Sequence, residues 1–389
     1  MMKLRTGQRW AMILLALLAL VGVMLLLPVR ASADGGAPNL AYVAGTSHGI
    51  SAIDIQQQKV TTTLSVPGDP HAILLSLDGR FLYVTQPALN RFSIIAARNG
   101  QTICSASVPG QPTLLTFDPG TNVVYVAGNG AASVSGFDAT SCALKHTIKT
   151  SGPVFGLAVA VVGTGNNGGT GNQLWVADST SIAYYDSSGK KMGGFPVAGG
   201  AGYLVIPAGP FVYATTHNGG VIAIDLNTLK PSAPLITGGP YGTMDYDAVT
   251  GEILIPDQGH NQIDVLAPLV SGAPVPHEPE RVIPLGVKPE SIAITSDGQL
   301  GFVALSGGNV AMLDLPGRQL VNTILVGGNP HFIITGLYPP IVGTTPQQAS
   351  TWNTIASVLA YVIIVILILV PILLFRRFNR KGKVDKKGD

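Results

Sequence analysis

Short apolar stretches separated by turn residues run along most of this chain, and one pattern returns at a regular interval. One copy reads DGRFLYVTQ, from Asp78 to Gln86. Apolar runs of this length, bounded by Gly, Pro, Asn and Asp, are typical of β-strands joined by tight turns. The aromatic or bulky residue of the pattern stands 38 to 50 residues apart in seven copies: Tyr42, Tyr83, Tyr125, Trp175, Tyr213, Leu254 and Phe302. A period near 40 residues indicates the four-stranded blade of a propeller.

Other landmarks keep the same period. A glycine-rich turn and a proline precede the first strand of a unit, as in VPGDP and VGGNP. Proline is tolerated at the first residue of a strand, and a pair such as Asp78-Gly79 then favours a hairpin turn. The third strand ends in aspartate in five copies: Asp54, Asp138, Asp186, Asp225 and Asp314. We interpret these carboxylates as turn formers that bond their own backbone, not as catalytic acids.

The order of the strands predicts how the ring closes. With the strands of a unit named A to D, the repeats open on a B strand, LAYVAG, and finish on an A strand, HFIITGL. We therefore expect an all-β, seven-bladed β-propeller of four-stranded blades. The C-terminal A strand should join the N-terminal B, C and D strands, which removes exposed sheet edges.

The repeat resembles that of the YVTN family of β-propeller proteins, which includes lactonase-like seven-bladed propellers. The stretch PGDPHAILLSLDGRFLYVTQPALNRFSIIAA carries the likeness, which covers about residues 40 to 338. The resemblance implies the fold, whereas fold does not fix function. It also implies a metal held by acids and amides in the central channel, but the only inward carboxylates we can propose here are Glu290 and either Asp245 or Asp247.

Both ends of the chain have the composition of targeting segments. Residues 1–33 combine a basic start, an apolar run and the small-residue site Ala31-Ser32-Ala33, which predicts a signal peptide. An uncleaved N-terminal anchor is the alternative, and either segment would export the central part of the chain. Residues 353–375 predict a transmembrane helix, since about 20 apolar residues cross a bilayer.

The segments beside this helix set its orientation. Residues 376–389 form a basic tail, which the positive-inside rule places in the cytoplasm. Residues 339–352 form a Pro/Thr-rich linker, and residues 34–338 form the propeller. We therefore predict a single-pass protein of the cell membrane with its propeller outside the cell.

The charge of the central part differs from the net charge of +2 of the whole chain. Residues 34 to 352 hold 12 basic and 19 acidic side chains, a net of −7. Nucleic-acid binding depends on Lys and Arg at phosphates. We therefore expect no nucleic acid among the partners, which leaves the membrane and an unknown protein, glycan or small-molecule ligand.

Candidate binding residues gather where the D–A and B–C connections share one face of a propeller. The candidates in B–C connections are His48, His217 and His260. The candidates beside the D–A prolines are Asp69, His71, Lys288, Glu290, Asn329 and His331. Loop positions on a rigid scaffold commonly carry function.

Three of these residues come from consecutive blades of the closed ring. His71, Glu290 and His331 each follow a D–A proline directly, at the mouth of the central channel. Two imidazoles and a carboxylate are a ligand set for Zn²⁺ or a similar divalent ion. The alternative is that they are ordinary residues of the repeat and that the protein has no cofactor.

The two cysteines, Cys104 and Cys142, belong to the outer rims of neighbouring blades. Disulfides persist outside the cell, so we expect a bond between them. The chain contains neither a C-x-x-C-H haem motif nor a G-x-S-x-G nucleophile elbow. Two hypotheses for function remain: a binding or interaction module at the cell surface, which we favour, and a metal-dependent lactonase-like hydrolase or lyase.

Overall fold

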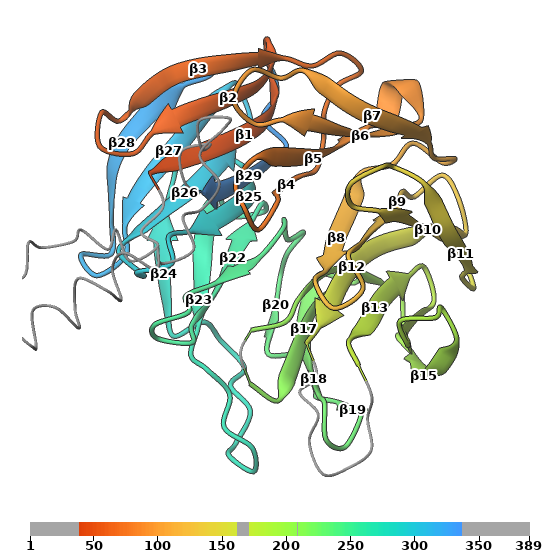
Figure 1. The fold of residues 1–389 in the computed structure, drawn as a ribbon. Coiled ribbons are helices and arrows are strands. Elements are labelled where there is room, and N and C mark those ends of the chain that lie inside the picture. The colour runs from red at the N-terminus through yellow and green to blue at the C-terminus, as the bar shows by residue number, and fades with distance from the viewer. Residues whose placement is uncertain (1–38, 162–170, 208, 337–389) are drawn as a thin grey trace, which may run out of the picture. The chain divides into compact units, whose positions relative to one another are not determined.

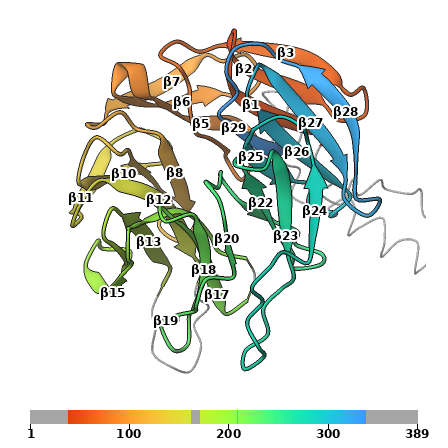
Figure 2. The same ribbon diagram turned by 180° about the vertical axis from the view of Figure 1, so that it is seen from behind.

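The computed structural model describes residues 39–161, 171–207 and 209–336, which form seven β-sheets arranged around a ring (Figures 1 and 2). The predicted signal peptide, linker, transmembrane helix and basic tail lie outside these residues. In the part of the chain that is described, no helix is long and apolar enough to cross a membrane.

Each sheet is one antiparallel blade, and its innermost strand lies beside the channel. The innermost, or A, strands are β29 (Phe332–Gly336), β4 (Ile73–Leu75), β8 (Leu114–Asp118), β12 (Val154–Ala160), β16 (Ala201–Val205), β21 (Asp245–Tyr246) and β25 (Pro289–Ile294). The B strands are β1 (Leu40–Thr46), β5 (Phe81–Gln86), β9 (Val123–Ala127), β13 (Gln173–Asp178), β17 (Phe211–Thr216), β22 (Ile253–Asp257) and β26 (Leu300–Leu305).

The outer two strands of each blade are the C strand and the D strand, which forms the rim. The C strands are β2 (Gly49–Asp54), β6 (Arg91–Ala96), β10 (Ser133–Asp138), β14 (Ser181–Tyr185), β18 (Gly220–Asp225), β23 (Gln262–Leu266) and β27 (Asn309–Asp314). The D strands are β3 (Lys59–Ser65), β7 (Thr102–Ser107), β11 (Leu144–Lys149), β15 (Lys191–Pro196), the split pair β19 (Lys230–Pro231) and β20 (Ile236–Thr237), β24 (Arg281–Pro284) and β28 (Gln319–Leu325). We number the blades from the one that contains β1.

The ring closes as the strand order predicted. Strand β29 lies antiparallel to β1, with Leu40 opposite Gly336 and Ala44 opposite Phe332. The first blade therefore has the order β29-β1-β2-β3 and is built from both ends of the repeat region. This closure confirms the predicted seven-bladed propeller.

The B and C strands in the middle of each blade are more buried than the D strand at its outer edge. All five residues of β9 are buried, whereas β7 alternates between exposed and half-buried positions. The repeated aromatic position of the B strand is buried in every blade, and Tyr42, Trp175 and Phe302 are among the largest fully buried side chains. Because B strands are covered by a neighbouring blade on each face, this repeated position forms the packing between blades.

The aspartates that end the C strands form turns in the predicted way. The Asp138 carboxylate accepts the backbone N–H of Thr140, and the Asp225 carboxylate accepts that of Asn227, at 3.0 and 2.7 Å. Carboxylates that bond the backbone two residues onward define Asx turns. These groups hold the C–D turns, as the sequence predicted.

A disulfide joins Cys104 of β7 to Cys142, which lies in the turn between β10 and β11. The Cα atoms are 5.9 Å apart, within the range that a disulfide requires. The bond links the outer edges of the second and third blades. Cys142 is itself buried among side chains of both blades, including Tyr83 and Phe137.

A segment of blade six packs against blade five. Its D strand is split into β19 and β20, and the long connection between β23 and β24 extends away from the ring beside it (Figure 1). Within this connection, the Leu269 N–H donates to the Tyr213 hydroxyl at 3.3 Å. His277 Nδ1 lies 3.2 Å from the Pro234 carbonyl oxygen. The Pro-rich insertion therefore connects two neighbouring blades.

Blades six and seven are joined along the channel itself. Thr243 donates its N–H to the Glu290 carbonyl at 3.0 Å, and its own carbonyl accepts the Ile292 N–H at 3.2 Å. The Asp245 carboxylate continues this parallel contact by accepting the Ile294 N–H at 2.8 Å. Burial raises the pKa of Asp245 to about 6, although two backbone amides that bond it act in the opposite direction.

Candidate functional site

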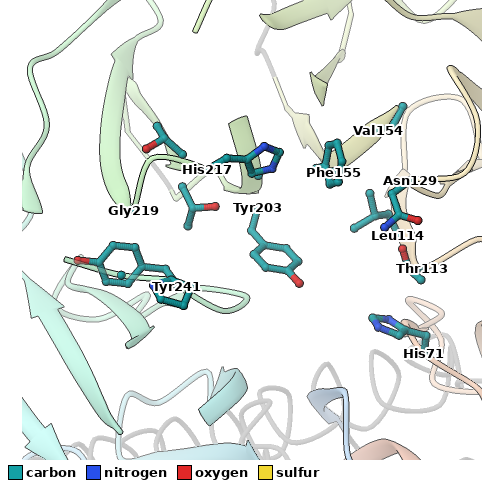
Figure 3. Close-up of a pocket in the computed structure, with 15 residues that line it drawn as sticks. His71, Thr113, Leu114, Asn129, Val154, Phe155, Tyr203, His217, Gly219 and Tyr241 are labelled. Atoms are coloured by element: carbon teal, nitrogen blue, oxygen red, sulfur yellow. The ribbon is translucent and has the colours of Figure 1, made fainter. Parts of the chain in front are cut away.

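A pocket of about 470 Å³ lies on the face formed by the D–A and B–C connections, at one side of the channel mouth (Figure 3). Its walls come from blades two to six. The residue directly after a D–A proline, which the sequence pattern placed at the channel mouth, also marks this pocket. His71, Thr113, Val154 and Tyr241, each directly after a D–A proline, all line it.

The lining combines aromatic rings with neutral polar groups. Its aromatic and imidazole side chains are His71, Phe155, Tyr203, His217 and Tyr241. Its hydroxyl and amide side chains include Thr113, Asn129, Thr215 and Thr216. Among the described residues that line the pocket, none is Lys, Arg, Asp or Glu.

Tyr203 stands near the middle of the pocket, with Phe155 and His217 on one side and Tyr241 on another (Figure 3). The Phe155 and His217 rings meet edge to face with centroids 4.5 Å apart. Burial raises the pKa of the Tyr203 hydroxyl, which also interacts with the side chain of Thr243. The Tyr203 hydroxyl is therefore un-ionised at neutral pH, and it offers the pocket a neutral polar atom beside an aromatic face.

Small residues make room for this arrangement. Gly202 precedes Tyr203, and a Cβ atom there would collide with the Thr215 hydroxyl at 2.6 Å. Gly219 adopts a φ of +75°, and a Cβ there would lie 2.9 Å from the Gly239 carbonyl. Both glycines belong to the pocket wall. Their lack of a side chain therefore allows neighbouring segments of the wall to approach closely.

Two of the predicted metal ligands meet, but as a stacked pair. The His71 and His331 rings stack with centroids 4.6 Å apart and planes inclined by 13°. His331 Nε2 lies 3.5 Å from the Asp69 carboxylate, and Asp69 has a positive φ of 55°. Burial, together with the neighbouring His331, lowers the pKa of His71 to about 4, so His71 is neutral at physiological pH.

The third predicted ligand is engaged by other side chains. Glu290 accepts Nζ–H of Lys288 at 2.9 Å and Nε2–H of Gln258 at 2.8 Å. Throughout residues 39–161, 171–207 and 209–336, no group of three or more His, Cys, Asp or Glu side chains is placed to hold a metal ion. The structure thus brings His71 and His331 together without assembling the expected three-ligand set.

The remaining candidates are spread around the same face. His217 lies in the pocket, whereas His48 is exposed beside Ser47, at 3.4 Å from its hydroxyl. His260 is exposed, and its Nδ1 lies 2.7 Å from the buried Asp257 carboxylate, which raises the pKa of the imidazole. Asn329 is exposed, and its backbone N–H donates to the Gly45 carbonyl at 2.8 Å.

Sequence reasoning missed the two aromatic residues that define the pocket most strongly. Phe155 lies one position beyond the post-proline residue Val154, inside β12. Tyr203 lies in β16, the only A strand of the seven that no proline introduces, where the sequence reads VAGGAGYLV. Aromatic residues at channel-facing positions of the A strands would have been the signal, had the register of β16 been known.

The architecture is shared with several solved structures. A candidate 6-phosphogluconolactonase from Bacteroides fragilis NCTC 9343 aligns with a TM-score of 0.62 at 16% identity, over 78% of this chain and 99% of that one. A chain of hydrazine synthase from Kuenenia stuttgartiensis aligns with a TM-score of 0.59 at 18% identity, over 78% and 99%. Apo AztD from Citrobacter koseri gives a TM-score of 0.56 at 12% identity, over 77% and 99%.

These likenesses show the fold alone, because all three identities are below 25%. No protein-family model and no curated protein sequence matches the chain. The class that the fold defines is the seven-bladed β-propeller with its pocket at the channel mouth.

Proposed function

We propose that this protein is an exported propeller of the YVTN type, tethered to the membrane by residues 353–375, which binds a ligand outside the cell. The observation that carries the proposal is the pocket of about 470 Å³ at the channel mouth. Its volume is within the range of roughly 300–1,000 Å³ that is common for small-molecule sites, and it combines aromatic walls with a few polar groups.

Two further observations support export and tethering. A disulfide between Cys104 and Cys142 suits an oxidising compartment outside the cytoplasm. The apolar run at residues 353–375 and the basic tail beyond it have the composition of a membrane anchor. The propeller would then present its pocket at the cell surface.

The contacts of the titratable residues favour binding over catalysis. His71 is neutral and stacked on His331, and Glu290 is bonded by Lys288 and Gln258. A general acid, base or metal site needs groups that converge on a reacting atom. These contacts hold the candidate groups in separate interactions, so we propose capture of a ligand without turnover.

The test is a thermal-unfolding screen of the full chain in detergent against fractions of a cell-envelope extract. A ligand at 100 times its dissociation constant stabilises the folded state by about 2.7 kcal/mol. The Asn129→Trp variant places a large ring at the exposed rim of the pocket, and Asn99→Trp makes the same change in a C–D turn, on the opposite face.

We expect at least one fraction to raise the unfolding temperature of the wild type and of Asn99→Trp, but not that of Asn129→Trp. The active compound should be recovered unchanged after incubation. Consumption of the compound would instead identify an enzyme. A shift that is equal in all three proteins would show that the pocket is not the binding site.

A further inference from the structure

The charge of the pocket restricts what it can bind. The described lining contains no Lys, Arg, Asp or Glu side chain, and its titratable groups are two imidazoles and two tyrosines. A buried charge without a partner is costly. Among the described lining residues, an anionic or cationic ligand would therefore find no carboxylate, ammonium or guanidinium group to pair with.

The aromatic side chains restrict the shape and surface of the ligand. Phe155 and His217 form an edge-to-face pair, Tyr203 stands between that pair and His71, and Tyr241 forms another wall (Figure 3). Flat aromatic faces bind other flat, C–H-rich faces with good packing and little loss of conformational freedom. The ligand should therefore contain rings with at least one apolar face.

The polar groups exclude a purely apolar ligand. Thr113, Asn129 and Thr215 belong to the lining, and each has a side chain that can both donate and accept a hydrogen bond. Covering such groups with a hydrocarbon would leave them without partners, at a cost of about 1–3 kcal/mol each. Hydroxyl groups on the ligand could satisfy them, because a hydroxyl also donates and accepts.

We propose that the ligand is an uncharged saccharide, whose sugar rings stack on the aromatic walls while their hydroxyl groups bond Thr113, Asn129 and Thr215. Sugar rings combine apolar C–H faces with hydroxyl-rich edges, which matches the two kinds of lining. This inference rests on the proposed function and names the ligand class of the same site.

The experiment uses saturation-transfer NMR on the full chain, in a detergent whose headgroup contains no sugar. The probes are two matched pairs that differ in charge: tri-N-acetylchitotriose against its deacetylated, cationic form, and a neutral galactotriose against anionic trigalacturonate. We expect at least one neutral trisaccharide to bind, with its charged counterpart at least tenfold weaker.

Variants assign any binding to the pocket. Phe155→Ala removes an aromatic wall and should weaken binding by roughly tenfold, and Asn129→Trp should abolish it. Phe195→Ala is the matched control, because Phe195 is also half-buried but lies in the outer strand β15. Thermal unfolding without ligand verifies that each variant is folded.

The other possible results separate an error in the ligand class from an error in the proposed function. If the charged trisaccharides bind as tightly as their neutral counterparts, and Phe155→Ala weakens that binding, the claim that the ligand is uncharged is refuted. The proposed binding function is then retained. If none of the four trisaccharides binds while an envelope fraction still gives an Asn129-dependent thermal shift, the ligand class is wrong and the function stands. If both signals are missing, the proposed function falls as well.

Discussion

Loss of the Cys104–Cys142 disulfide should destabilise the propeller strongly, because the bond closes a long loop. The two cysteines are 38 residues apart in sequence and join the rims of two blades. In the chain-entropy description, a loop of this length restricts the unfolded state by about 4 kcal/mol at 25 °C. The perturbation is Cys104→Ala, which removes the bond and leaves Cys142 buried in place.

The assay is equilibrium unfolding in urea, which reports both the midpoint and the slope. We expect the free energy of unfolding to fall by about 4 kcal/mol, and the slope to rise, because an unfolded chain without the cross-link exposes more surface. Chemical reduction of the wild type should produce the same midpoint as the variant. Reductant should have no effect on Cys104→Ala, which serves as the control.

A change of less than about 1 kcal/mol in the variant would refute the entropic reasoning. It would mean that residual structure already holds the two cysteine segments near each other in the unfolded ensemble, or that the folded state relaxes when the bond is lost. A drop in the variant without a rise in slope would locate the effect in the folded state instead.

Two other predictions concern buried polar groups. In the unfolded chain His71 has its ordinary pKa of 6.5, whereas in the folded chain its pKa is about 4. The unfolded state therefore binds a proton first as the pH falls from 6.5 to 4, and the free energy of unfolding should fall by about 3 kcal/mol because of this residue. The measurement is the difference in unfolding free energy between wild type and His71→Gln, taken at pH 7 and at pH 4.5. The variant is needed because Asp245 and Asp264, whose pKa values are raised to about 6, stabilise the folded state as the pH falls over the same interval. A difference that does not change with pH would contradict the prediction. The Tyr42 hydroxyl is buried without a hydrogen-bond partner among the described residues, so Tyr42→Phe should stabilise by about 1 kcal/mol in thermal unfolding. Tyr213→Phe should instead destabilise, because its hydroxyl accepts a bond from the β23–β24 connection, and equal effects would count against the argument.

The repeat made the fold predictable because each landmark has one local physical cause that acts in several blades. The buried aromatic of the B strand, as at Tyr42, fills the space between blades. The aspartate after the C strand, as at Asp138, bonds its own turn. The closing strand β29 was predictable from the order in which the repeats begin and end. None of these inferences required knowledge of contacts between distant segments.

Features that occur in one blade only were not predictable in the same way. The parallel contact of Thr243 with β25 depends on how the segment before β21 meets an A strand of the neighbouring blade. The stacking of His71 on His331 depends on the distance between two neighbouring connections, and it differs from the three-ligand metal site that was one of the two alternatives for these residues. Tyr203 has no proline before it to fix its register.

The pocket lies where the repeat varies, and this placement has a physical reason. A position that carries the same kind of side chain in every blade serves the packing that all blades share, as the buried aromatic of the B strand does. A pocket selects one ligand over another through side chains that differ from blade to blade. The post-proline position supplies such differences, since it holds His71, Thr113, Val154 and Tyr241 in successive or nearby blades. Similarity between repeats therefore specifies the fold of this chain, and differences between repeats specify what its channel mouth can bind.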